Sequence, residues 1–117
     1  MLRSGQTKYK APVTVTANYT ILANDDDIIC NGSGTIKLVL PAASSFSGRR
    51  LRIKTIADQS VVSADADGTL QSNVAPIDSA TAGSAILPAY KGSFVELSSD
   101  GTNWVAMMFY SANKISY

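Results

Sequence analysis

The sequence of 117 residues contains no histidine and a single cysteine. Without histidine, the chain has no Ser-His-Asp or Cys-His relay, no histidine-ligated zinc site and no imidazole base near neutral pH. One cysteine cannot close a disulfide within the chain or build a thiolate cage for a metal. Cys30 lies in an apolar run without a basic neighbour, so we expect a small buried side chain. We therefore expect neither an enzyme nor a cofactor site.

Charged residues and long apolar runs are also scarce. The charged fraction is 16% and the formal net charge is +1, whereas typical domains have about 25% charged residues. Nucleic-acid-binding proteins usually carry a strong basic excess, which is missing here. No window approaches the roughly 18 apolar residues of a membrane span, and the first ten residues lack a signal-peptide core. We expect a protein that is made in the cytosol and binds neither nucleic acid nor membranes.

The length predicts a single domain, because domains usually contain about 100–200 residues. A hydrophobic fraction of 45% is enough for one globular core. We divide the chain into an N-terminal arm at 1–12, a β-domain at 13–110 and a C-terminal tail at 111–117. Both ends are polar, and such ends fray unless something holds them, so we expect a neighbouring chain to order them.

The apolar residues alternate with a period near two, which is typical of β-strands. The pattern is clearest at 35–40 and 50–55, where one side of each strand is apolar. The other side of the strand at 50–55 carries Arg50, Arg52 and Lys54. Further expected strands lie at 13–16, 19–22, 60–63, 94–97 and 104–110. Most of these runs are bounded by Gly, Pro, Asn, Asp or Ser. The sequence therefore predicts an all-β fold, an antiparallel β-sandwich or a barrel-like domain.

Turn residues connect several of these strands. We expect hairpin turns at the Asn-Gly-Ser-Gly segment 31–34 and at 99–103, and a third turn at 64–69. Residues 39–53 and 86–97 share an order of strand, proline, glycine and second strand. We interpret these two segments as similar hairpins.

Three polar motifs could carry chemistry, and each has a simpler interpretation. The Asp25–Asp27 run could contribute oxygen ligands to a cation, but neighbouring side chains on a strand diverge, and we favour a solvated strand entry. Asp65-x-Asp67-Gly68 resembles the start of a calcium loop without its later ligands, which favours a plain turn. The basic row of Arg50, Arg52 and Lys54 could contact phosphates, but we favour a solvated or subunit-facing side.

Residues 104–110 are apolar on both faces of the expected strand. A strand with one face in water would alternate, so this strand is either central in the fold or packed against another chain. The adjacent Met107 and Met108 suit adaptable packing. The pattern alone leaves the core and the subunit contact open.

The order of the motifs resembles a β-module of bacteriophage virion proteins, found in head-decoration proteins and tail fibres. The resemblance is carried by Thr35-Ile36-x-Leu38-x-Leu40-Pro41-Ala42-Ala43 with Gly48-Arg49-x-Leu51-x-Ile53-Lys54, and by Val95-x-Leu97-x-Ser99-Asp100-Gly101-Thr102-Asn103-Trp104. The resemblance implies a non-enzymatic, homotrimeric, all-β virion component. Whole tail fibres are much longer than this chain, so a decoration (cement) protein on the capsid fits better.

The leading hypothesis is a capsid decoration protein that stabilises the head through trimer contacts and through its arms. Its partners would be two further copies and the major capsid protein, and its location would be the virion. The residues we expect at interfaces are Tyr9, Val13 and Val15 of the arm, Arg50 and Arg52 of the basic row, and Trp104, Met107 and Phe109. The alternative is a tail-fibre or adaptor module that binds a host receptor or glycan.

Overall fold

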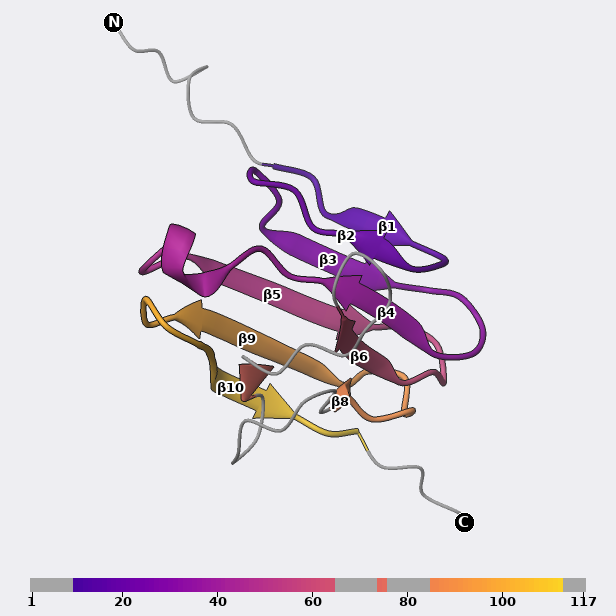
Figure 1. Ribbon diagram of the computed structural model, residues 1–117. Coiled ribbons are helices and arrows are strands. Elements are labelled where there is room, and N and C mark those ends of the chain that lie inside the picture. Colours follow the sequence, from indigo (N-terminus) through magenta and orange to yellow (C-terminus); the bar gives the residue numbers. More distant parts are fainter. Residues whose placement is uncertain (1–9, 65–73, 76–84, 113–117) are drawn as a thin grey trace, which may run out of the picture.

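The computed structural model describes residues 10–64, 74–75 and 85–112. Two β-sheets pack face to face, which confirms the predicted all-β sandwich (Figure 1). Sheet A contains, in spatial order, β1 (Val13–Val15), β3 (Asp27–Cys30), β5 (Arg50–Thr55), β9 (Phe94–Ser99), β10 (Trp104–Tyr110) and β7 (Val74–Ala75). Sheet B contains β2 (Tyr19–Thr20), β4 (Ile36–Val39), β6 (Val61–Ala64) and β8 (Ala85–Leu87).

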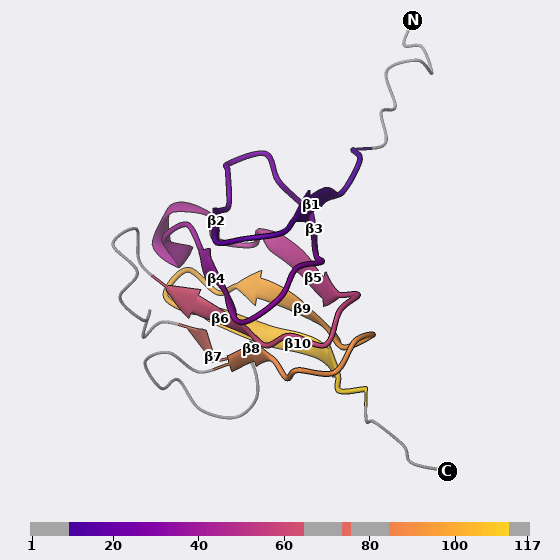
Figure 2. The same cartoon turned by 90° about the vertical axis from the view of Figure 1, so that its right-hand side faces the viewer.

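The first six strands alternate between the two sheets. β1, β3 and β5 lie side by side in sheet A, and β2, β4 and β6 lie side by side in sheet B (Figure 2). Each return of the chain therefore places a strand parallel to the previous strand of the same sheet. This path is a flattened parallel solenoid. The predicted antiparallel pairing is wrong for this part, and among the described strands it holds for β5–β9, β9–β10 and β6–β8.

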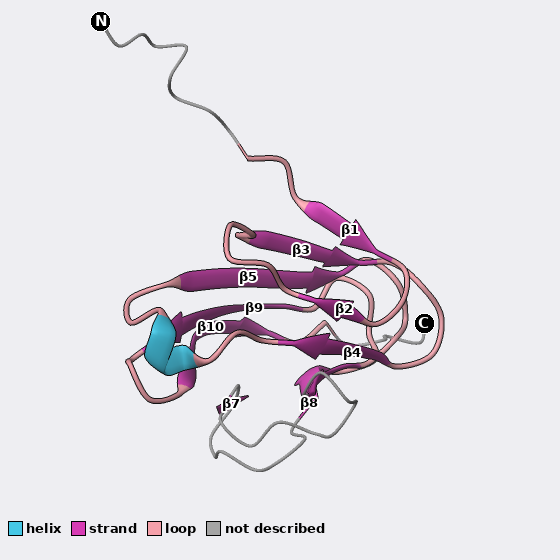
Figure 3. Cartoon of the chain, turned by 45° about the horizontal axis from the view of Figure 1, so that its top comes forward, coloured by secondary structure: helices cyan, strands magenta, loops and turns pink. Residues whose placement is uncertain are grey.

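Three of the expected hairpins are arches that cross from one sheet to the other. The segment 31–34 joins β3 of sheet A to β4 of sheet B, and the two proline-marked segments each run from sheet B to sheet A. The second of these arches contains the 3₁₀ turn η2 (Ala43–Ser45), drawn in cyan in Figure 3. The turn at 99–103 is a true hairpin, with Trp104 opposite Ser99. Of the turn expected at 64–69, Ala64 is the last residue of β6, and residues 65–69 lie outside the described residues.

The two proline-marked arches are nevertheless alike. Gly48 and Gly92 have φ values of 88° and 99°, which are accessible to glycine without strain. The Gly48 N–H donates to the Ser99 carbonyl (2.8 Å) and the Gly92 N–H donates to the Thr55 carbonyl (2.7 Å). The glycines therefore let each arch close against sheet A. The similar sequences at 39–53 and 86–97 do form similar connections. Each connection, however, joins a strand of one sheet to a strand of the other sheet and not two paired strands.

The core lies between the sheets and follows the predicted alternation. In β5, Leu51, Ile53 and Thr55 are buried, and the three intervening basic side chains are exposed. Leu38 of β4 and Leu97 of β9 are fully buried in the same cluster. Trp104 is also fully buried, and its indole N–H donates to the Pro41 carbonyl at 2.8 Å. Each large apolar side chain contributes about 1.5–3 kcal/mol through burial, so these strands hold the sheets together.

A buried glutamine fastens the arch between β3 and β4. Gln59 is 2% exposed. Its side-chain oxygen accepts the Gly32 N–H (2.8 Å), and its amide nitrogen donates to the Gly34 carbonyl (3.0 Å). The burial of both amide ends is therefore compensated, and the arch is fixed against the loop that precedes β6.

Gly32 is also required by space, which gives a first prediction. A Cβ atom at this position would lie 2.4 Å from the Thr16 carbonyl oxygen, a backbone atom, whereas a Cβ at Gly34 would meet nothing within 4 Å. Gly34 has a φ of 74°, a conformation that asparagine tolerates. We expect Gly32→Asn to lower the free energy of unfolding by about 1–3 kcal/mol and Gly34→Asn to change it little. Urea denaturation followed by circular dichroism measures both, and equal effects would contradict the close packing at Gly32.

Candidate functional site

The C-terminal half of β10 exposes large apolar side chains. Met107, Met108 and Tyr110 are 63%, 55% and 52% exposed. Phe109 is exposed as well, and so is Phe94 at the start of β9. We refer to these five residues as the β10 patch. Monomeric proteins rarely gather large apolar side chains in this way, so the patch is a candidate interaction surface.

The backbone of β10 explains why the two halves of the strand differ. In the first half, Trp104 faces the core, and β7 pairs in parallel with Trp104 and Val105. The register then shifts between Ala106 and Met108, which indicates a β-bulge at Met107. Beyond Val105, no strand of the described residues pairs with the outer edge of β10. An open, apolar strand edge is a template for binding another chain.

The patch covers both sides of sheet A. Opposite residues of an antiparallel pair point to the same side of a sheet. Phe109 lies opposite the buried Val95 and therefore points to the inner side, whereas Met108 and Tyr110 lie opposite Glu96 and Phe94 and point to the outer side. The Phe94 and Tyr110 rings stack with centroids 5.5 Å apart and an interplanar angle of 26°. The candidate interaction surface is thus one apolar ridge along an edge of sheet A.

The outer side of sheet A also carries a shallow groove next to the patch. Its volume is about 330 Å³. The exposed or half-buried side chains along it are Pro12, Asp27, Ile29, Arg52, Lys54, Phe94, Glu96 and Met108. They come from β3, β5, β9 and β10 and from the segment before β1. The parallel and antiparallel register places them in rows across the sheet.

One row of the groove is a chain of charges. Arg52 donates from Nε and Nη2 to the two carboxylate oxygens of Asp27, both at 2.8 Å. On its other side Arg52 lies opposite Glu96. The hydrogen bonds to Asp27, its charge and that of Glu96 raise the pKa of the Arg52 guanidinium. This bidentate geometry fixes Arg52 across the strands, although an exposed pair of this kind contributes little to stability because water screens it.

The structure divides the seven predicted interface residues that it describes into three groups. Met107, Phe109, Arg50 and Arg52 are exposed, as an interface requires. Trp104 and Val15 are buried at 0% and 6% exposure within their own chain, so their prediction as contact residues is corrected. Val13 is half-buried and pairs with β3, so it belongs to the sandwich and not to a free arm. Tyr9 lies outside the described residues.

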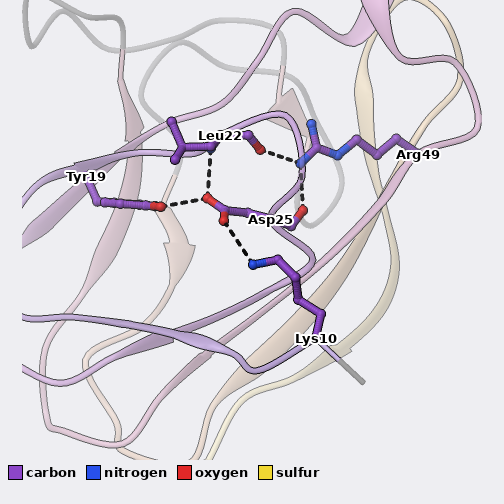
Figure 4. Close-up of polar contacts among 5 residues, drawn as sticks. All are labelled: Lys10, Tyr19, Leu22, Asp25 and Arg49. Atoms are coloured by element: carbon purple, nitrogen blue, oxygen red, sulfur yellow. Dashed lines mark hydrogen bonds and ion pairs between the residues drawn. The ribbon is translucent and has the colours of Figure 1, made fainter. Parts of the chain in front are cut away.

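The acidic run Asp25–Asp27 divides in space, and its expected solvation is wrong for Asp25. Asp25 is 2% exposed. Its carboxylate accepts the Tyr19 hydroxyl (2.6 Å) and the Leu22 N–H (2.8 Å), and it lies 3.9 Å from the Lys10 ammonium (Figure 4). Asp27 faces the outer groove instead. In the described residues, no group of three or more His, Cys, Asp or Glu side chains is placed to hold a metal ion.

The Asp25 cluster joins three separate segments. Arg49, which precedes β5, donates to the Leu22 and Asp25 carbonyls at 2.7 and 2.6 Å, so it ties the β2–β3 connection to sheet A (Figure 4). The hydrogen bond to the Asp25 carboxylate, with burial and the charge of Asp25, raises the pKa of Tyr19 to about 12. These hydrogen bonds all join segments of the same chain, which indicates a structural role, and Arg49 Nη1 is buried without a hydrogen-bond partner. Asp65 and Asp67 lie outside the described residues.

Cys30 is fully buried at the end of β3, as predicted. Burial raises the pKa of its thiol to about 12, so the reactive thiolate is scarce at neutral pH. Within the described residues, no helix has the length and apolar character needed to cross a bilayer. No family model, curated protein or solved structure matches the chain.

Proposed function

We propose that this protein is a non-enzymatic structural component of a bacteriophage virion, a decoration protein that binds the capsid and stabilises it. The observation that carries the proposal is the β10 patch, which exposes apolar side chains along an open strand edge. Such an edge is suited to association between chains and offers no polar constellation for bond cleavage or group transfer. The sequence resemblance to virion β-modules supports the same assignment.

The action of the protein is burial of surface upon assembly. Three copies related by a three-fold axis would associate along the open β10 edge and cover Met107 and Phe109, and a contact with the major capsid protein would hold the trimer on the shell. A protein that binds only the assembled shell stabilises it by mass action, without a covalent step. Arg50 and Arg52 lie on the outer side of sheet A, where they can contact an acidic surface of a neighbour.

The self-association of this protein is tested through Met107. Burying a large apolar side chain contributes about 1.5–3 kcal/mol, so Met107→Ser is expected to raise the dissociation constant by about 10–100-fold. Analytical ultracentrifugation over a concentration series measures this change. Leu22→Ser is the matched control, because Leu22 is 54% exposed outside the β10 patch. An unchanged oligomer in Met107→Ser, or a monomeric unmodified protein at all concentrations, would argue against the proposed surface.

Capsid binding is tested separately. Purified phage heads assembled without this protein are mixed with it and pelleted, and their resistance to heat is compared with that of untreated heads. We expect co-sedimentation and a higher temperature of head disruption. Absence of the protein from the pellet would refute the decoration role.

A further inference from the structure

The outer groove of sheet A contains a cation with unusual neighbours. The register places Lys54 between Ile29 of β3 and Phe94 of β9, so its two neighbours across the strands are both apolar. Among the described residues no carboxylate forms an ion pair with Lys54. Arg52, in the same groove, has Asp27 as a bidentate partner. Lys54 is therefore the cation of this groove that is left to bind an anion from outside.

A flat aromatic surface adjoins this cation. Phe94 lies next to Lys54 in the row, and its ring stacks on Tyr110. Aromatic faces bind other flat faces that carry C–H groups, because they bury apolar area and interact through the ring quadrupole. Arg52 and Glu96 form the next row and can exchange hydrogen bonds with hydroxyl groups. The groove thus combines one free positive charge, one aromatic face and several polar groups.

We propose that this groove binds a sugar unit that carries a carboxylate. The carboxylate pairs with the Lys54 ammonium in a charge-assisted hydrogen bond, the flat face of the sugar ring packs against Phe94, and hydroxyl groups bond to Arg52 and Glu96. The groove volume of about 330 Å³ is near the lower end of the range of about 300–1,000 Å³ for small-molecule sites, which suits one or two sugar rings.

The groove shares Phe94 and Met108 with the β10 patch, but it extends over the outer face of sheet A, away from the β10 edge. Phe109 points to the inner side of sheet A, Met107 is the bulged residue of β10, and neither of them lines the groove. Pairing of another chain along the β10 edge would extend sheet A sideways and would leave its outer face open. A saccharide site and a subunit contact can therefore coexist on one chain, and each can be tested without the other.

The test is a titration of the ¹⁵N-labelled full chain followed by NMR. The probes are sodium glucuronate, neutral glucose and sodium acetate, which supply the charged ring, the ring alone and the anion alone. We expect glucuronate to shift the amide signals of Lys54, Phe94 and their neighbours, and we expect glucose and acetate to bind at least about tenfold more weakly, because each lacks one element of recognition. No shift with glucuronate, or equal binding of acetate, would overturn the proposal.

Two variants locate the binding. Lys54→Met keeps the apolar stem and removes the charge, and we expect glucuronate to bind it about 10–100-fold more weakly. Arg50→Met is the matched control, because Arg50 points to the same side of β5 but does not line the groove. The dispersed amide spectrum of each variant reports that it is folded. Unchanged binding in Lys54→Met, or an equal loss in Arg50→Met, would refute the site. Glucuronate binding by a strictly monomeric protein would refute only the assembly role.

Discussion

Replacement of Trp104 by alanine is expected to lower the free energy of unfolding by about 3–5 kcal/mol, because it leaves a large cavity between the sheets. Trp104 is fully buried at the start of β10, where it packs against the core of both sheets. Small domains are stable by only about 5–15 kcal/mol, so this single change removes a large part of the total. We expect a much lower urea midpoint or a largely unfolded chain at room temperature.

A second Trp104 variant separates packing from hydrogen bonding. The indole N–H donates to the Pro41 carbonyl, which lies at the beginning of the arch between β4 and β5. Trp104→Phe keeps most of the apolar volume but leaves this carbonyl without its partner, and we expect a loss of about 1–3 kcal/mol. Circular dichroism must follow the transitions, because Trp104 is the only tryptophan and its fluorescence disappears with the substitution. A loss below about 1 kcal/mol in Trp104→Ala would contradict its place in the core.

The same residue illustrates what the sequence could predict and what it could not. A strand that is apolar on both faces has two explanations, and both apply to β10, but at different ends. Trp104 is enclosed by its own chain, whereas Met107 and Met108 are exposed after the bulge. The bulge is a mismatch of one residue between β9 and β10, and no local pattern marks it. We expected Trp104, Met107 and Phe109 together at an interface, and only Met107 and Phe109 have the exposure that this requires.

Alternation within a strand was predictable, but the partner of each strand was not. The period of two placed Arg50, Arg52 and Lys54 on one side of β5, and the structure confirms this. Turn-forming residues indicate where the chain bends, but they do not indicate which sheet the next strand joins. We therefore mistook arches between the sheets for hairpins. Parallel pairing joins strands that are many residues apart, such as β3 with β5. The groove escaped prediction for the same reason, because Ile29, Lys54 and Phe94 meet only through this pairing.

Asp25 was the clearest error about a polar residue, and its replacement gives the second large effect that we expect. Asp25→Ala should lower the free energy of unfolding by about 2–4 kcal/mol, since the Tyr19 hydroxyl and the Leu22 N–H both lose a charged acceptor. Lys10 contributes little to this figure, because it is 40% exposed and its ammonium lies 3.9 Å away. Urea denaturation at neutral pH measures the loss. A loss as small as that in Lys10→Met would show that the carboxylate is not structurally required.

The pH dependence of stability isolates the bond between Tyr19 and Asp25. Tyr19 has its pKa raised from 10.0 to about 12 in the folded protein, mainly because its hydroxyl donates to the Asp25 carboxylate, and ionisation would set two anions against each other. A pKa that is higher in the folded state means that the contact stabilises the fold below pH 10 and that this contribution is lost as the pH rises toward 12. Cys30, whose pKa is also raised to about 12, titrates in the same range in both proteins. We therefore expect Tyr19→Phe to be less stable than the unmodified protein at pH 8 and to lose less stability between pH 10 and 12. If the two curves of stability against pH are parallel, the Tyr19 hydroxyl does not bond to Asp25. If they converge, the loss of this hydrogen bond contributes to the loss of stability at alkaline pH.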